Sequence, residues 1–147
     1  LKLSVVPEVV GGRRVVLVDD SIIRGTTIQK RIDMLRRAGA KEVHVRISCP
    51  PTRHPCFFGI DFPEPDELVA AGRSVEQIRQ LCGADSLGYL SLDGLRSVLK
   101  NPQHYCYGCF AGHYPCSIEH VVNKHALERA RPENLEDRHH RHDVMIQ

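Results

Sequence analysis

Two adjacent acids, Asp19 and Asp20, directly follow a short apolar run and precede small and hydroxyl-bearing residues. Residues 15–27 read VVLVDDSIIRGTT. A carboxylate at such a position can bind a divalent metal ion, accept hydrogen bonds from ribose hydroxyls, or act as a base. Small residues after it let backbone N–H groups approach a phosphate closely. These small positions are Ser21, Gly25, Thr26 and Thr27. The combination suits a phosphorylated ribose.

The elements around these residues predict a parallel β-α-β unit. The apolar run predicts a strand over residues 15–19, with apolar residues on both faces as in a parallel sheet covered on both sides. Apolar residues at helical spacing predict a helix over residues 26–38, which ends at Gly39. Alternating apolar and polar residues predict a second strand over residues 42–48. The helix would then present its N-terminus to an anion beside the acids.

The remainder of the chain predicts shorter elements. The proline-rich segment 52–65 cannot be a helix. Helices are expected over residues 64–71, 74–81 and 93–99, and a strand over residues 87–92. The second of these helices begins with a capping box formed by Ser74 and Gln77. The chain from residue 123 onward is rich in Arg, Glu and His and is expected to be disordered. Its histidines, His139, His140 and His142, are expected to be solvated.

Composition excludes several classes of function. The 147 residues suffice for one domain, and a net charge of +2 without a long basic block does not point to nucleic acid. The sequence has no apolar run close to the ~20 residues that span a bilayer and no signal peptide, so we expect a soluble, cytoplasmic protein with no membrane partner. The first residue is Leu1 rather than Met, which suggests part of a longer protein or a truncated gene model.

Six cysteines are many for this length. Because nothing signals secretion, metal or cluster binding is favoured over disulfides. Cys106 and Cys109 form a C-x-x-C pair, a spacing shared by zinc sites and redox pairs, and Cys56 precedes them in a proline-flanked loop. Cys82 is expected in the core. Cys49 and Cys116 remain alternative ligands.

The stretch VVLVDDSIIRGTT resembles the ribose-phosphate signature of the type I phosphoribosyltransferases. Three further segments, AGAKEVHVRISCPPTRHPCFFGIDFP, GADSLGYLSLDGL and CYGCFAGHYP, resemble the C-terminal part of the glutamine phosphoribosylpyrophosphate amidotransferases, in order and approximate spacing over residues 2–116. The resemblance implies an α/β fold: part of a type I phosphoribosyltransferase with a Rossmann-like parallel sheet, short C-terminal helices and a Cys-rich loop. It implies a pentosyltransferase that uses glutamine-derived ammonia to displace pyrophosphate from phosphoribosyl pyrophosphate (PRPP). The product, 5-phosphoribosylamine, is made in the first committed step of purine biosynthesis.

The same resemblance implies roles for individual residues. Asp19 and Asp20 would lie at the ribose hydroxyls and at the Mg²⁺ of the substrate, with Ser21 beside them. Residues 24–27, which are Arg24, Gly25, Thr26 and Thr27, would hold the 5′-phosphate. No residue is expected to act as a nucleophile, because the chemistry depends on positioning and charge stabilisation.

Cys56, Cys106 and Cys109 would, by the same resemblance, be three ligands of a structural [4Fe–4S] cluster. The fourth cysteine would lie outside this chain. A zinc site is the alternative, because four thiolates suit Zn²⁺ equally well.

The resemblance also divides the chain. Residues 1–100 would be the C-terminal part of the phosphoribosyltransferase domain, residues 101–122 the cluster-binding segment, and residues 123–147 a tail. The glutaminase domain and the rest of the pyrophosphate site would lie on polypeptide that this chain lacks. The chain alone is therefore expected to be inactive, and the resemblance implies that the full-length protein is a homo-oligomer, a tetramer. Two alternatives are a non-catalytic PRPP-sensing module and another phosphoribosyltransferase. The cysteines favour the enzyme over the sensor, and the resemblance beyond residue 48 argues against another phosphoribosyltransferase.

Overall fold

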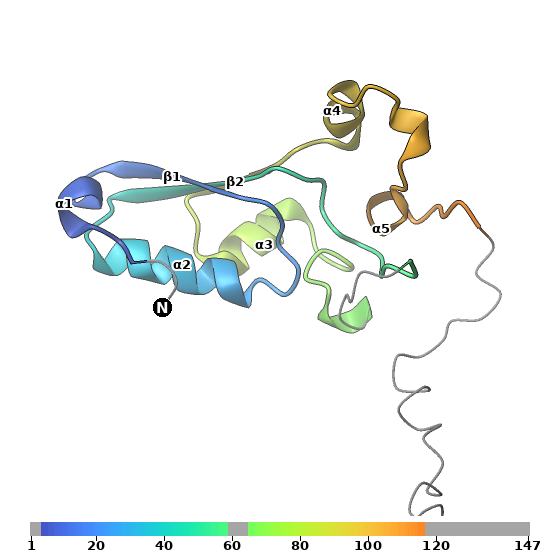
Figure 1. Cartoon of the computed structure of the whole chain (residues 1–147). Coiled ribbons are helices and arrows are strands. Elements are labelled where there is room, and N and C mark those ends of the chain that lie inside the picture. Colours follow the sequence, from blue (N-terminus) through green and yellow to red (C-terminus); the bar gives the residue numbers. More distant parts are fainter. Residues whose placement is uncertain (1–3, 59–64, 117–147) are drawn as a thin grey trace, which may run out of the picture. The chain divides into compact units, whose positions relative to one another are not determined.

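Three parallel strands form one sheet in the computed structural model, which describes residues 4–58 and 65–116 (Figure 1). The strands are β1 (Arg14–Asp19), β2 (Glu42–Ile47) and β3 (Ser86–Tyr89), in the order β1-β2-β3. Helix α2 (Thr26–Arg37) connects β1 to β2, and helix α3 (Val75–Cys82) lies between β2 and β3. The predicted β-α-β unit is confirmed, and a second one follows it.

The register brings the carboxyl ends of the strands to one edge. Asp19 pairs with Ile47 across β1 and β2, and Ile47 pairs with Tyr89 across β2 and β3. The loop after β1, which carries the acids, and the loop after β2 therefore leave the sheet side by side. Ser48 fixes this arrangement, because its backbone N–H donates to the Asp19 carbonyl at 3.0 Å.

Helices α2 and α3 cover the same face of the sheet (Figure 1). The predicted apolar stripe of α2 is confirmed, since Ile28, Ile32 and Leu35 are all buried against the sheet. From the sheet, Val43, Val45 and Ile47 project into the same core because alternate residues of a strand share a face. Burial of these side chains is the main force that holds α2 on the sheet.

The ends of both helices follow from local chemistry. Gly39 follows the last turn of α2 at φ +91°, a conformation that glycine adopts without strain. The predicted capping box of α3 is confirmed: the Ser74 hydroxyl accepts from the Gln77 N–H at 3.2 Å, and the Gln77 side chain accepts from the Ser74 N–H at 2.8 Å.

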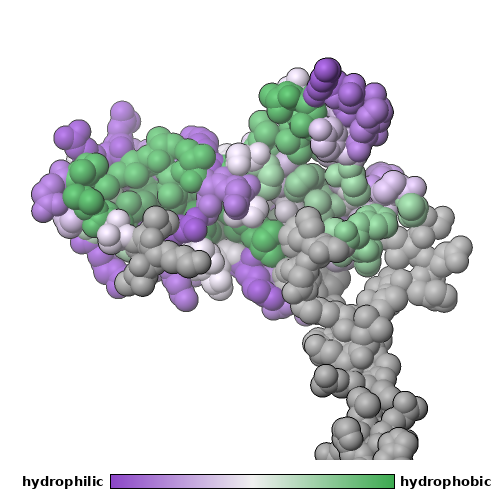
Figure 2. All heavy atoms as spheres, in the orientation of Figure 1, coloured by the Kyte–Doolittle hydropathy of each residue, from purple (hydrophilic) through white to green (hydrophobic). Residues whose placement is uncertain are grey.

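The expectation that β1 is buried on both faces is wrong for the described part of the chain. Val16 and Val18 are 60% and 68% exposed, whereas Val15 and Leu17 pack against the core. The reason is that both connecting helices lie on one face. Figure 2 shows hydrophobic residues gathered on the side of the molecule where β1 runs. On β2 this open face is polar, with Glu42 and Arg46 flanking His44.

The predicted helix over residues 64–71 is also wrong. The described residues there form a 3₁₀ turn, Pro65–Glu67, followed by a tight turn. Leu68, Val69 and Ala70 are buried in succession, and three consecutive residues cannot share one face of a helix. Instead, the Val69 N–H donates to the Ile23 carbonyl at 2.8 Å and attaches this turn to the loop after β1.

Smaller differences concern element ends. Strand β3 ends three residues earlier than predicted, and α4 (Leu92–Ser97) begins one residue earlier because Ser91 caps it, its hydroxyl accepting from the Gly94 N–H. Three short helices were not predicted: α1 (Pro7–Val10), η2 (Pro102–His104) and α5 (Gly108–Ala111). None of the described helices is long and apolar enough to cross a membrane. Residues 117–147, with the predicted tail, lie outside the described residues.

Candidate functional site

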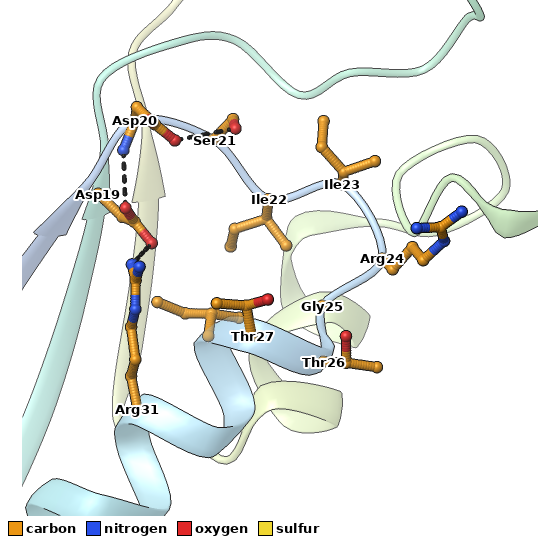
Figure 3. Close-up of a pocket in the computed structure, with 11 residues that line it drawn as sticks. Asp19, Asp20, Ser21, Ile22, Ile23, Arg24, Gly25, Thr26, Thr27 and Arg31 are labelled. Atoms are coloured by element: carbon orange, nitrogen blue, oxygen red, sulfur yellow. Dashed lines mark hydrogen bonds and ion pairs between the residues drawn. The ribbon is translucent and has the colours of Figure 1, made fainter. Parts of the chain in front are cut away.

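The acid loop, residues 19–28 from the end of β1 to the first turn of α2, lines one pocket (Figure 3). Its volume is about 280 Å³, and it lies between the carboxyl end of β1 and the N-terminus of α2. The structure therefore brings all the substrate-binding candidates of the sequence together. The pocket is lined by Asp19, Asp20, Ser21, Ile22, Ile23, Arg24, Gly25, Thr26, Thr27, Ile28 and Arg31.

The floor of the pocket is the first turn of α2. Gly25 precedes the helix at φ +84° and provides no capping side chain, so no side chain occupies the place of a ligand there. The first N–H groups of a helix have no partner within the helix, and they carry the positive end of its dipole. The N–H groups of Thr26, Thr27 and Ile28 are thus available to an anionic group.

The two acids are held differently. Asp19 Oδ1 accepts from the Asp20 backbone N–H at 3.1 Å, and Asp19 Oδ2 accepts from the Arg31 guanidinium. Asp20 Oδ1 accepts from the Ser21 hydroxyl at 3.0 Å. Asp19 is only 18% exposed at its side chain, while Asp20 is exposed. The two carboxylates therefore have distinct surroundings, as expected for successive residues at a strand end.

Arg24 is turned away from the acids (Figure 3). Its guanidinium forms two hydrogen bonds with the Glu67 carboxylate, of 3.0 and 3.2 Å. This pair joins the acid loop to the 3₁₀ turn Pro65–Glu67 and lies largely in solvent. That Arg24 binds a phosphate remains a prediction. The Glu67 carboxylate would compete with the phosphate for the Arg24 guanidinium.

Arg31 is a charged pocket residue that the sequence analysis missed. It lies one helical turn after Thr27, at the i+4 position, and so faces the same pocket. That spacing is the signal that could have identified it. The sequence analysis of this helix used only its apolar positions.

The second group of predicted site residues is the cysteine loop, which here means the segment around Cys56 together with the segment around Cys106 and Cys109. The backbone N–H groups of Arg53 and His54 both donate to the Cys109 carbonyl, at 2.9 and 3.0 Å. The Tyr114 hydroxyl donates to the Pro55 carbonyl at 2.7 Å, and its ring lies 5.1 Å from that of Phe57. These contacts bring the loop of Cys56 to the loop of Cys109.

The thiols of this loop influence one another. Burial raises the pKa of Cys109, and the neighbouring Cys56 and Cys106 raise it further. Backbone N–H groups point at two of the sulfurs: Phe58 N–H at Cys56 Sγ, 3.5 Å, and Gly108 N–H at Cys106 Sγ, 3.4 Å. Across residues 4–58 and 65–116, however, no three His, Cys, Asp or Glu side chains are grouped closely enough to hold a metal ion.

The remaining cysteines have separate environments. Cys82 is buried in the core, as predicted, beneath Gly25. Burial, with Asp20 and Cys109 nearby, raises the pKa of Cys49 to about 11, and its thiol donates to the Pro50 carbonyl. Cys116 is exposed. Neither Cys49 nor Cys116 joins a described group that could hold a metal.

Comparison with known proteins gives consistent relatives. The chain is 53% identical over 134 residues to an amidophosphoribosyltransferase of Bacillus subtilis, which covers 87% of this chain and 28% of that protein. It is 50% identical over 125 residues to the chloroplastic amidophosphoribosyltransferase of Glycine max, covering 84% and 22%. The chain thus spans about a quarter of the length of the relatives it matches. No protein-family model matches it.

Two solved structures are similar to the described fold. One, the allosteric regulatory enzyme of purine biosynthesis, superimposes with a TM-score of 0.74 at 49% identity and covers 82% of this chain and 27% of that one. The other is the glutamine PRPP amidotransferase of B. subtilis complexed with ADP and GMP, with a TM-score of 0.72 at 51% identity, covering 80% and 27%.

The parallel sheet with its helices is that of a phosphoribosyltransferase domain, the class that the solved structures contain, and the pocket lies at the carboxyl end of β1 in this domain. The relatives then specify the family. The chain belongs with the amidophosphoribosyltransferases and corresponds to part of their C-terminal region.

Proposed function

We propose that the chain is the part of an amidophosphoribosyltransferase that binds the sugar and the 5′-phosphate of PRPP. In the whole protein, ammonia from glutamine would displace pyrophosphate and give 5-phosphoribosylamine. The observation that carries this proposal is the pocket itself, which joins two carboxylates to the uncapped start of α2. About 50% identity to amidophosphoribosyltransferases over most of this chain supports the choice of substrate.

The pocket residues divide into acceptors and donors. The carboxylates of Asp19 and Asp20 would accept hydrogen bonds from the ribose hydroxyls. The N–H groups of Thr26 and Thr27 and their hydroxyls would donate to the 5′-phosphate. These contacts fix the sugar while a cationic charge develops on it and pyrophosphate departs. The rest of the protein would supply ammonia and complete the pyrophosphate pocket.

The acids also fit a magnesium site. Mg²⁺ is usually held by one or two carboxylates together with substrate oxygens and water, so the donor set of Asp19 and Asp20 suffices. When bound with the substrate, the ion would neutralise charge on the departing pyrophosphate. These two residues are the ones that we assign to it.

We assign three of the four ligands of a [4Fe–4S] cluster to the cysteine loop, because thiolates are the ligands that such clusters require. The thiols of Cys56, Cys106 and Cys109 are close enough to perturb one another, and N–H groups point at two sulfurs, as in thiolate–metal loops. The fourth ligand would come from outside this chain. In the part of the chain that the structure describes, the three thiols do not lie close enough together to hold a metal ion, so the loops that carry them would have to draw together when the cluster binds. The cluster would pin this loop to the preceding polypeptide. Zinc is the second candidate.

Nuclear magnetic resonance of the ¹⁵N-labelled chain tests the substrate site. Titration with PRPP and Mg²⁺ is expected to shift the amide signals of residues 24–28, because those N–H groups would bind the phosphate. Ribose 5-phosphate should shift the same signals, because it carries the same phosphate. Asp20→Asn should weaken binding of PRPP, whereas Asp93→Asn, an exposed acid on α4, should not. A spectrum unchanged at millimolar PRPP would contradict the proposal.

Metal analysis after anaerobic purification tests the cysteine loop. We expect iron, sulfide and visible absorbance from the full-length protein, and their loss in Cys106→Ser and Cys109→Ser but not in Cys116→Ser. A colourless protein that contains zinc would favour the second candidate.

Turnover tests the division of labour between this chain and the rest of the protein. We expect the 147-residue chain to bind PRPP without forming phosphoribosylamine, even when ammonia replaces glutamine. The full-length protein, which we expect to be a homotetramer, should be active. Turnover by the chain alone would show that it contains the whole phosphoribosyl-transfer site.

A further inference from the structure

Arg31 lies in the pocket without a place in the proposed binding of sugar and phosphate. Its Nη1 donates to Asp19 Oδ2, and the two side chains are 33% and 18% exposed. An ion pair at this degree of burial is screened less by salt than one on the surface. The pair therefore fixes the orientation of Asp19 relative to α2 (Figure 3).

The two acids consequently differ in what they can still bind. Each oxygen of the Asp19 carboxylate already accepts a hydrogen bond, from Asp20 N–H and from Arg31, and the Asp19 carbonyl accepts from Ser48. Asp20 is exposed, and the donor found for its carboxylate among the described residues is the Ser21 hydroxyl. Asp20 thus keeps more free hydrogen-bond acceptor sites than Asp19. Among the described residues, no cationic side chain forms an ion pair with Asp20.

We propose that Arg31 is a positioning residue that divides the work of the two acids: it neutralises Asp19 and holds it as a hydrogen-bond acceptor for a ribose hydroxyl, and it leaves Asp20 as the carboxylate that faces the divalent cation. A carboxylate has about four acceptor sites, so Asp19 keeps capacity for a hydroxyl. This inference rests on the proposed function, because it assigns separate roles within the same PRPP site.

The charge of the pocket explains why Arg31 matters for a cation. With Arg31 present, the two carboxylates and this one cation carry a net charge of −1; without Arg31, the two carboxylates alone carry −2. Removal of Arg31 should therefore strengthen binding of a free divalent ion and make Asp19 available to it. Arg24 cannot replace Arg31, because Arg24 is paired with Glu67 on the other side of the loop.

Binding of Mn²⁺ alone, measured by water-proton relaxation with the full 147-residue chain, tests this division. With Arg31 in place, we expect the single substitution Asp20→Asn to weaken Mn²⁺ binding about tenfold or more. The single substitution Asp19→Asn should weaken Mn²⁺ binding less than about threefold. Arg31→Met should tighten Mn²⁺ binding about tenfold, and in that background Asp19→Asn should become as harmful as Asp20→Asn.

The matched control is Lys30→Met, which removes the same charge from the adjacent, exposed position of α2. It should change Mn²⁺ affinity less than about twofold, because an exposed charge is screened. Arg31→Lys keeps the charge and should leave the Mn²⁺ affinity close to that of the wild type. Arg31→Gln provides a second neutral variant if Arg31→Met proves unstable.

Two results would overturn the inference: equal losses of Mn²⁺ affinity in Asp19→Asn and Asp20→Asn, or the same affinity in Arg31→Met and Lys30→Met. A separate titration with PRPP and Mg²⁺ keeps this inference apart from the proposed function. If the wild-type chain fails to bind PRPP, the proposed function fails. If PRPP binds but the Mn²⁺ affinities do not separate the two acids, the role given to Arg31 fails and the PRPP site remains.

Discussion

Asp85 and Val43 are joined by a short hydrogen bond: the Val43 N–H donates to Asp85 Oδ2 at 2.6 Å. The same carboxylate oxygen accepts from Arg36 Nη2 at 2.5 Å. Asp85 lies just before β3, Val43 lies in β2, and Arg36 lies in the last turn of α2. One carboxylate therefore connects a helix with the beginnings of two neighbouring strands.

Replacement of this carboxylate should destabilise the fold in a pH-dependent way. The hydrogen bond from Val43 and the charge of Arg36 hold the pKa of Asp85 below its usual value. Asp85→Asn should reduce the free energy of unfolding by about 1 kcal/mol at pH 7, a value lowered to allow for solvent screening. Because the folded-state pKa is depressed, the stabilisation is present above the unfolded pKa, ~3.9, and is lost as pH falls through the folded pKa.

Urea denaturation at pH 7 and pH 3 measures this effect. The difference between the wild type and Asp85→Asn should shrink at the lower pH. Asp93→Asn is the control, because the Asp93 side chain is 96% exposed. An equal difference for Asp85→Asn at both pH values would show that the charge of Asp85 contributes nothing.

Gly25→Ala should strain the start of α2. Gly25 has φ +84°, which an alanine reaches only at a cost of about 1–2 kcal/mol. The added methyl group would not clash with its neighbours, because the nearest atom, Val69 Cγ2, would lie 3.6 Å away. Thermal unfolding should show the loss, and PRPP binding should weaken because the N–H groups shift. Gly72→Ala, with open space and no positive φ, should be neutral.

Glu67→Gln should strengthen PRPP binding severalfold if Arg24 contacts the phosphate as predicted. The Glu67 carboxylate competes for the Arg24 guanidinium through two hydrogen bonds. The exposed pair itself is worth about 0.2–1 kcal/mol, so stability should change little. Calorimetric titration with PRPP measures the affinity. An unchanged affinity would indicate that Arg24 only joins the loop to the Pro65–Glu67 turn.

The thiols should differ in their rates of alkylation. Cys106 and Cys116 are exposed, whereas burial raises the pKa of both Cys49, to about 11, and Cys82. Because the thiolate is the nucleophile, iodoacetamide at pH 8 should modify the metal-free chain first at the two exposed cysteines. Peptide mass spectrometry identifies the order. Early modification of Cys82 would mean that the core around α3 opens readily.

Periodicity and capping predicted the elements that depend on nearby residues. The spacing of Ile28, Ile32 and Leu35 located α2, and Ser74 with Gln77 located the start of α3. Seven pocket residues, Asp19 to Ser21 and Arg24 to Thr27, were also predicted, since they lie close together in the chain; Arg31 was not. In all these cases, the signal and the structure lie within a few residues of each other.

Features that depend on distant residues could not be predicted in this way. Glu67 meets Arg24 across 43 positions, and the reach of Arg31 to Asp19 depends on how α2 sits on the sheet. The helix expected over residues 64–71 failed because contact with Ile23 determines the backbone of Val69. One face of β1 is exposed because both connecting helices lie on the other face of the sheet. The apolar sequence of the strand does not indicate which face the helices will cover.

The strand order β1-β2-β3 also bears on how the chain folds during synthesis. Among the three described strands, β2 and β3 each pair with the strand made just before them, so neither has to be inserted between two earlier strands. A chain that emerges from the ribosome with its N-terminal part first can add each strand to an existing edge. The Ser48 N–H meets the Asp19 carbonyl as soon as β2 has paired with β1. The end of β1 at Asp19 can therefore be held in place before α3 and β3 have been translated, whereas Gly25, farther along the loop, packs over Cys82 of α3.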